Sequence, residues 1–137
     1  NFISRYVSKS LVPLPKDLNV ESQFIHEKDI AQALYCLATE ASPGVYNLGP
    51  PNTIASAELV EMMGGKAIYL SGGLLRAMTA LAWTLRIRSL TEAPSSMIDF
   101  IECSWVVEGS KVEQETSFRY QYTSTDAVRD FAEAQTA

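Results

Sequence analysis

The chain has 137 residues, which is enough for one domain with its own hydrophobic core. Hydrophobic residues make up 47% and charged residues 20%, and the net charge is −5, which argues against a nucleic-acid partner, because proteins that bind nucleic acid normally show a basic face. The two cysteines, Cys36 and Cys103, stand far apart and there is only one histidine, so no metal site is expected. We expect both to be free thiols in a reducing cytoplasm.

No membrane segment is expected either. The most apolar stretch, residues 74–85, is shorter than the roughly 20 residues that a membrane-spanning helix needs, and Arg76 interrupts it. The first 12 residues lack the apolar core of a signal peptide, so a cytoplasmic location is expected. The chain starts without Met and already in a helical pattern, which suggests a piece of a longer protein.

Apolar periodicity and turn residues predict short strands and several helices. In chain order, the first predicted elements are a helix over 2–9, an extended segment at 11–15, a polar loop, a strand at 23–26 and a helix from about 30 to 39. They are followed by a strand at 45–49, an extended segment at 53–55, a helix capped by Ser56, a strand at 66–70 and an apolar helix over 74–86. The last predicted elements are helical segments at 97–103 and 112–116, with a strand and turn between them, and a helix capped by Ser124 or Thr125.

The only histidine lies in the segment QFIHEKDIAQAL, beside three charged residues. Asp29 precedes the apolar helical pattern and Gln32 follows three residues later, which matches a variant of the capping box. This interpretation assigns Asp29 to helix initiation and leaves His26 as a pocket residue at the end of a strand. A metal site at His26 is not expected, because no second ligand recurs at helical spacing.

Motifs for cofactor binding and catalysis are absent from the sequence. The glycine pairs 64–65 and 72–73 do not have the spacing of a nucleotide-binding loop, and no Tyr is followed four residues later by Lys. No local signature of a Ser-His-Asp or Cys-His-Asn site is present. Motifs alone therefore predict only an α/β domain.

The order of the segments is more informative. QFIHEKDIAQAL, GVYNLGPP, TIASAELVEMMG and SKVEQETSFRYQYTSTDAV resemble, in this order, the C-terminal half of an extended short-chain dehydrogenase/reductase, the NAD-dependent epimerase/dehydratase family. The resemblance implies a C-terminal fragment of a Rossmann-type α/β fold. In it, residues 1–50 belong to the nucleotide-binding domain and residues 51–137 form a substrate-binding lobe. It also implies NAD(P) for the full-length protein and none for this fragment, because the glycine loop and the Tyr-x-x-x-Lys pair lie upstream.

The resemblance also guides the choice of site residues. It predicts no catalytic, cofactor-binding or metal-binding residue in this chain, and it predicts Gln23, His26 and Arg76 as substrate-binding residues. An Arg that binds diphosphate in many members is replaced here, where Ser22 and Gln23 stand. The apolar side chains of the helix over 74–86 either suit a less charged substrate or form core.

Three functions remain open from the sequence. The first is the substrate-binding portion of an NAD(P)-dependent epimerase, dehydratase or reductase that acts on a hydroxyl-bearing small molecule. The second is a non-catalytic regulatory or binding module derived from that family, and the third is an NAD-independent enzyme built around His26. The expected partners are a small-molecule substrate, the missing cofactor-binding half and a second copy in a homodimer, with residues 2–7 or 30–48 at its interface.

Overall fold

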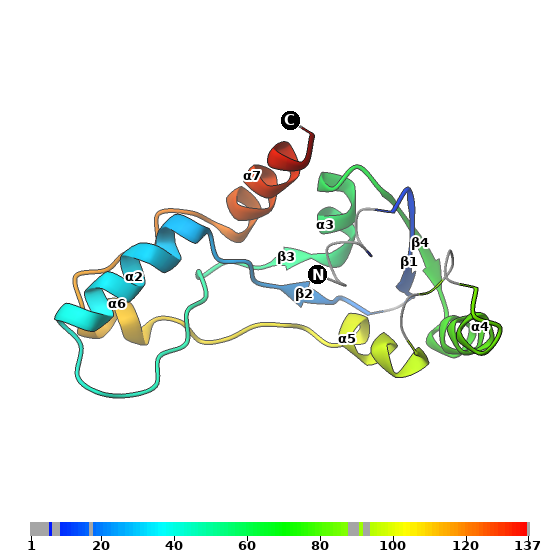
Figure 1. Cartoon of the computed structure of the whole chain (residues 1–137), viewed down its shortest axis with the longest axis horizontal. Helices are drawn as coiled ribbons and strands as arrows, with labels where there is room; N and C mark the ends of the chain where they lie inside the picture. The colour runs from blue at the N-terminus through cyan, green and yellow to red at the C-terminus, as the bar shows by residue number, and fades with distance from the viewer. Residues whose placement is uncertain (1–5, 7–8, 17, 88–90, 92–93, 137) are drawn as a thin grey trace. The chain divides into compact units, whose positions relative to one another are not determined.

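The computed structural model describes residues 6, 9–16, 18–87, 91 and 94–136. The predicted helix over 2–9 therefore lies almost entirely outside the described residues. The chain is α/β, with short strands and several helices (Figure 1). Its elements are β1 (Leu11–Pro15), β2 (Glu21–Ser22), α2 (Glu27–Thr39), β3 (Ile54–Ala55), α3 (Ser56–Met62), β4 (Lys66–Leu70), α4 (Gly72–Thr84), the 3-10 helix η1 (Ser95–Ile98), α5 (Asp99–Glu102), α6 (Lys111–Glu115) and α7 (Ser124–Thr136).

The chain divides into two compact units that alternate along the sequence. Unit 1 comprises residues 1–20 and 55–104, and unit 2 comprises residues 21–54 and 105–137. The sequence predicted a sequential division at residue 50, with cofactor-side elements before it. That division refers to a longer protein and stays a prediction.

Unit 1 is built on a parallel pair of strands. β1 pairs with β4 from Leu11 opposite Lys66 to Pro15 opposite Leu70. Two prolines in β1 lack backbone N–H groups, which suits a strand that pairs on one side only. α3 and α4 pack near this pair, and the buried hydrophobic side chains among the described residues of this unit are Val12, Leu14, Val20, Leu59, Val60, Leu75, Ala82 and Ile98.

Glycine determines how α3 ends. Gly64 has a φ of +78°, in the left-handed region that favours glycine, and it ends the helix just after the C-cap Met63. Ser56 does not cap the helix, because Ala55 occupies the N-cap position and the Ser56 hydroxyl donates to the Val20 carbonyl. In α4, Leu75 is buried but Met78 and Leu81 are exposed, so the apolar side of that helix is core only in part.

Unit 2 is held by one side of α2 packed against the segment around α6. Ala33 and Cys36 of α2 contact Val112 and Phe118 in a buried cluster. The partly buried hydrophobic residues around this cluster are Leu37, Tyr46, Leu48 and Tyr120. The apolar side of this helix is core only in part, since Leu34 is 56% exposed.

Two predicted strands of unit 2 are absent. Residues 45–49 form no strand, because side chains hold their backbone groups: the Val45 carbonyl accepts from Lys111 and the Gly49 N–H donates to the Tyr120 hydroxyl. Residues 23–26 are not a strand either, since the backbone pairing of β2 ends where the Gln23 N–H donates to the Trp105 carbonyl. The Phe24 N–H then donates to the Ser124 hydroxyl.

Candidate functional site

The cavity of unit 2 is bounded by two chain segments that glycine residues allow to come close. Its volume is about 410 Å³. A side-chain carbon on Gly109 would collide with the backbone of Gly49, and one on Gly49 would lie 2.8 Å from Val107 Cγ2. These two glycines therefore permit an approach that larger residues would prevent. The lining residues are Gln23, Gly49, Pro50, Pro51, Val106, Val107, Glu108, Gly109, Ser110, Glu113 and Tyr120.

Gln23 joins the two walls of this cavity. Its Nε2 donates to the Pro50 carbonyl at 2.7 Å, and its Oε1 accepts from the Val107 N–H at 2.7 Å. Both ends of the amide are thus engaged, which fixes the side chain between the segments. Gln23 is the one predicted substrate-binding residue that lines the cavity, and its contact with a substrate stays a prediction.

Tyr120 makes the second connection across the cavity. Its hydroxyl accepts from the Gly49 N–H at 3.0 Å and donates to the Gly109 carbonyl at 3.1 Å. Burial raises the pKa of this hydroxyl above its ordinary value, so the phenol is neutral at neutral pH. No motif singled out Tyr120, although it lies within the segment SKVEQETSFRYQYTSTDAV that carries the resemblance.

Two carboxylates line the same cavity. Hydrogen bonds from Ser110 lower the pKa of Glu108, whose Oε1 accepts the Ser110 N–H at 3.0 Å. Glu113 Oε1 accepts the Tyr120 N–H at 3.3 Å. The lining residues include no Lys, Arg or His. The cavity can therefore hold neutral or positively charged groups more readily than anions.

The wall at Pro50 and Pro51 is anchored by the buried Ser124. The Ser124 N–H donates to Asn52 Oδ1 at 2.9 Å, and the Ser124 hydroxyl donates to the Asn52 carbonyl at 2.8 Å. Ser124 therefore fixes the loop after the two prolines rather than capping α7. The cap of α7 is a reciprocal pair, in which Thr123 Oγ1 accepts the Asp126 N–H and Asp126 accepts the Thr123 N–H.

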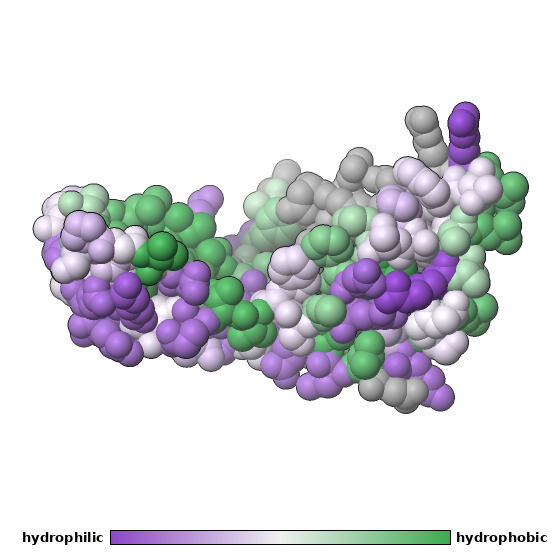
Figure 2. Space-filling view, turned by 90° about the horizontal axis from the view of Figure 1, so that it is seen from below, coloured by the Kyte–Doolittle hydropathy of each residue, from purple (hydrophilic) through white to green (hydrophobic). Residues whose placement is uncertain are grey.

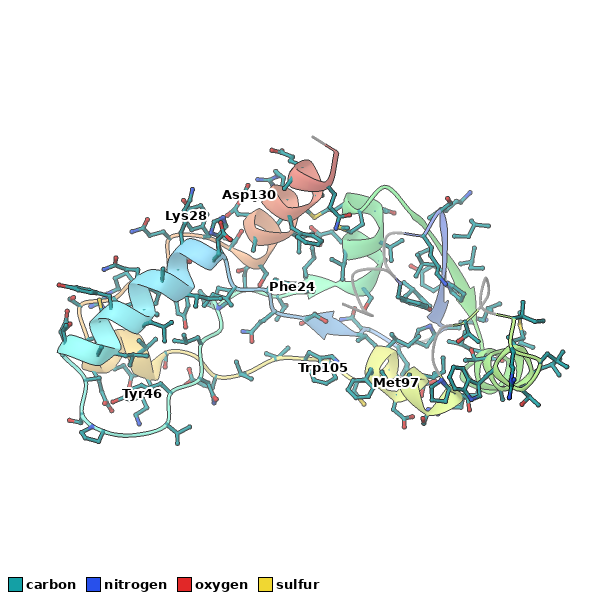
Figure 3. All side chains as sticks on the ribbon, in the orientation of Figure 1. Phe24, Lys28, Tyr46, Met97, Trp105 and Asp130 are labelled. Atoms are coloured by element: carbon teal, nitrogen blue, oxygen red, sulfur yellow. The ribbon has the colours of Figure 1, made fainter. Side chains whose placement is uncertain are left out.

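His26 is the N-cap of α2, and Asp29 is not. His26 Nδ1 accepts the Lys28 N–H at 3.1 Å, and its ring stacks on Tyr122 with 3.9 Å between the ring centres. Because Nδ1 accepts, Nε2 carries the hydrogen and donates to Asp130 at 2.9 Å. Both nitrogens are engaged and the residue is 6% exposed, which describes a structural histidine. Figure 3 shows Lys28 at the start of α2 and Asp130 in the middle of α7. A contact between His26 and a substrate stays a prediction.

Asp29 instead joins α2 to the chain before α7. Its carboxylate accepts the N–H groups of Gln121 and Tyr122 at distances of 3.1 to 3.3 Å, and the residue is 2% exposed. The prediction of a capping box at Asp29 was therefore wrong. The sequence pattern could not reveal this, because the two donors lie more than 90 residues away along the chain.

Arg76 belongs to unit 1 and is neutralised there. One of its guanidinium nitrogens contacts Asp99 at 2.6 Å and also contacts Glu102. These two carboxylates raise the pKa of Arg76 further above its ordinary value, with Asp99 as the larger cause. Its contact with a substrate stays a prediction. A substrate would have to compete with Asp99 and Glu102 for this guanidinium group.

The described residues do not fit the pyrophosphate of NAD. A strand followed by glycine at a helix N-terminus, the geometry that binds such a group, occurs at Ser71–Gly73 between β4 and α4. A side-chain carbon on Gly72 would lie 2.7 Å from Glu102 Oε1, so a carboxylate already occupies the space beside this turn. No group of acidic, His or Cys side chains suited to a metal ion is found among the described residues.

The fold is shared with Rossmann-type epimerases and dehydratases. A dTDP-glucose 4,6-dehydratase from Bacillus anthracis, in complex with NAD, matches with a TM-score of 0.59 and 16% identity. The match covers 97% of this chain and 38% of that one. A UDP-glucuronic acid 4-epimerase from Bacillus cereus, also in complex with NAD, matches with a TM-score of 0.57 and 9% identity over 100% of this chain and 40% of that one. The structure of gox2253 matches with a TM-score of 0.60 and 18% identity, over 97% of this chain and 41% of that one.

The chain also has relatives in sequence. Uncharacterized proteins of Mycobacterium bovis (Mb0513) and Mycobacterium tuberculosis (Rv0501) are 22% identical over 129 residues, which is 94% of this chain. The chain spans about a third of their length, since the match covers 34% of each. No protein-family model matches the chain. None of the described helices is long and apolar enough to span a membrane.

Proposed function

We propose that the chain is the substrate-binding C-terminal portion of an NAD(P)-dependent epimerase, dehydratase or reductase that acts on a hydroxyl-bearing small molecule. The observation that carries the proposal is the fold: 97–100% of the chain matches about two fifths of two enzymes solved with NAD. In this proposal the cytoplasmic parent protein supplies the cofactor site and the catalytic groups from outside this chain.

The role of this chain is then to bind and position the substrate. Gln23 and Tyr120 hold the walls of the unit 2 cavity together through hydrogen bonds to backbone atoms on both sides. A cavity of about 410 Å³ falls within the range of small-molecule sites, which are typically about 300–1,000 Å³. Because the described residues do not fit NAD, hydride transfer would need groups from outside this chain.

The apolar surface of unit 2 supports a partner for the chain. Leu34, Tyr35 and Val45 are 56%, 65% and 84% exposed, and apolar groups reach the surface of the part of unit 2 that holds α2 and α6 (Figure 2). We propose that the cofactor-binding half covers this surface in the parent protein. In the isolated chain a second copy covers it, which gives a homodimer with residues 2–7 or 30–48 at the interface.

The decisive experiment uses the parent protein. The reading frame around this sequence is read upstream, and the whole protein is purified and titrated with NAD and NADP by calorimetry. The proposal predicts a glycine-rich loop, a Tyr-x-x-x-Lys pair and binding of one of the two cofactors. A parent protein that lacks these motifs and binds neither cofactor would contradict it and would favour the non-catalytic module.

A further inference from the structure

The cavity of unit 2 has an unbalanced charge. Of its lining residues, Glu108 and Glu113 carry carboxylates, and the others are uncharged. The next cation along the chain, Lys111, is directed elsewhere: its ammonium donates to the Val45 carbonyl at 3.2 Å and lies 4.2 Å from the centre of the Tyr46 ring. A ligand in the cavity therefore meets negative charge without a compensating side chain of the lining.

Both carboxylates keep acceptor capacity for a ligand. An ionised carboxylate offers about four lone-pair positions, and the hydrogen bonds from Ser110 to Glu108 and from the Tyr120 N–H to Glu113 do not use all of them. The lowered pKa of Glu108 keeps its carboxylate ionised at neutral pH. Hydroxyl and ammonium groups can donate to these oxygens, whereas phosphate oxygens cannot and would be repelled.

The rest of the cavity supplies shape rather than charge. Pro50, Pro51, Val106 and Val107 offer apolar surface, and Tyr120 offers a neutral ring whose hydroxyl is already bonded to backbone on both sides. Such a lining suits the carbon frame of a small polyol, with its donor groups directed to the carboxylates.

We propose that this cavity takes a hydroxyl-bearing small molecule that is neutral or carries an ammonium group, and that it excludes nucleoside diphosphate derivatives. The inference rests on the proposed function, because it names the substrate class of the same site. It separates this chain from the dehydratase and the epimerase that it matches, whose names specify nucleotide-linked sugars.

The experiment is an NMR titration of the 137-residue chain labelled with ¹⁵N. The probes are glucosamine, glucose and UDP-glucose, at low ionic strength because exposed charges are screened by salt. We expect glucosamine and glucose to shift the amide signals of Val107, Gly109 and Tyr120. Glucosamine should bind about fivefold more tightly than glucose, the order expected for one ammonium near exposed carboxylates. UDP-glucose should leave these signals in place.

Two variants and one control assign the effect to the carboxylates. The double variant Glu108→Gln/Glu113→Gln should bring the ratio of the two affinities to about one, and Glu108→Gln alone, at an exposed position, should lower it without affecting the fold. Glu61→Gln removes an exposed carboxylate of unit 1 and should leave the ratio unchanged.

The outcomes separate this inference from the proposed function. UDP-glucose binding at the three amides, an unchanged ratio in the double variant, or no response to any probe would each overturn the inference. None of these results bears on cofactor binding by the parent protein. Failure of the parent protein to bind NAD or NADP would overturn the proposed function, whatever the probes show.

Discussion

The two units of this chain are stabilised by different kinds of interaction. Unit 1 relies on the ladder between β1 and β4 and on apolar side chains such as Val12 and Val60, both fully buried. Unit 2 has few strands, and buried polar side chains hold its loops: Asp29 and Ser124 each bond backbone groups far away in the sequence. Unit 2 should therefore be sensitive to single polar substitutions, and unit 1 to the loss of apolar volume.

The largest effect is expected for Asp29→Ala. This change removes the acceptor of two backbone N–H groups in a buried setting, so we expect the free energy of unfolding to fall by about 3 kcal/mol. Urea denaturation followed by circular dichroism measures the loss. Hydrogen exchange should show weaker protection in unit 2, around residues 118–124, before β1 and β4 respond. An equal loss of hydrogen-exchange protection in both units would show that the two units do not unfold separately.

The matching change in unit 1 is Val60→Ala. It removes two buried methyl groups from α3, and we expect a loss of about 2 kcal/mol through lost burial and a residual cavity. Hydrogen exchange should now increase first in β1 and β4, the reverse of the result for Asp29→Ala. A loss below about 0.5 kcal/mol would mean that the core of unit 1 repacks freely.

An intermediate effect is expected for His26→Ala. The change removes the N-cap of α2 and the stack on Tyr122, and we expect a loss of about 1.5 kcal/mol. His26→Asn, which can still cap the helix, should recover part of it and serves as the control. If both variants were as stable as the parent chain, His26 would not be structural, and a role in binding a ligand would regain support.

The smallest effect is expected for Glu40→Gln, which should change how strongly the stability of the fold depends on acid pH. Hydrogen bonds from the Ser117 backbone and hydroxyl lower the pKa of Glu40 from its ordinary value of 4.5. A folded-state pKa below the unfolded one stabilises the fold above about pH 4.5, and the contribution is lost as the pH falls through the folded value. Glu40→Gln should therefore flatten the decline in melting temperature between pH 6 and pH 3. An unchanged decline would assign acid sensitivity to other carboxylates.

The sequence predicted local elements well where periodicity was strong. The positions of α2, β4, α4 and α7 follow from apolar spacing, and β1 follows from the extended preference imposed by its two prolines. What could not be predicted depends on distant partners. Asp29 has the spacing of a helix cap, yet a loop that comes 92 residues later supplies its donors and changes its role.

The candidate site shows the same limit. Gln23 was identified through its place in the segment QFIHEKD, and it does line the cavity. Glu108, Glu113 and Tyr120 could not be selected, because each is an ordinary surface residue until Gly49 and Gly109 bring their segments together. Glycine at both positions was a usable signal, although the sequence does not reveal that the two approach each other.

The most direct test of the account is a calorimetric titration of the isolated 137-residue chain with NAD and NADP. If the chain is the substrate-binding portion of a larger enzyme, it should bind neither cofactor, since Glu102 lies beside the glycine turn that begins α4 and neither glycine pair, 64–65 or 72–73, has the spacing of a nucleotide-binding loop. Micromolar affinity of the isolated chain for either cofactor would contradict the account, because the cofactor site would then lie within these residues.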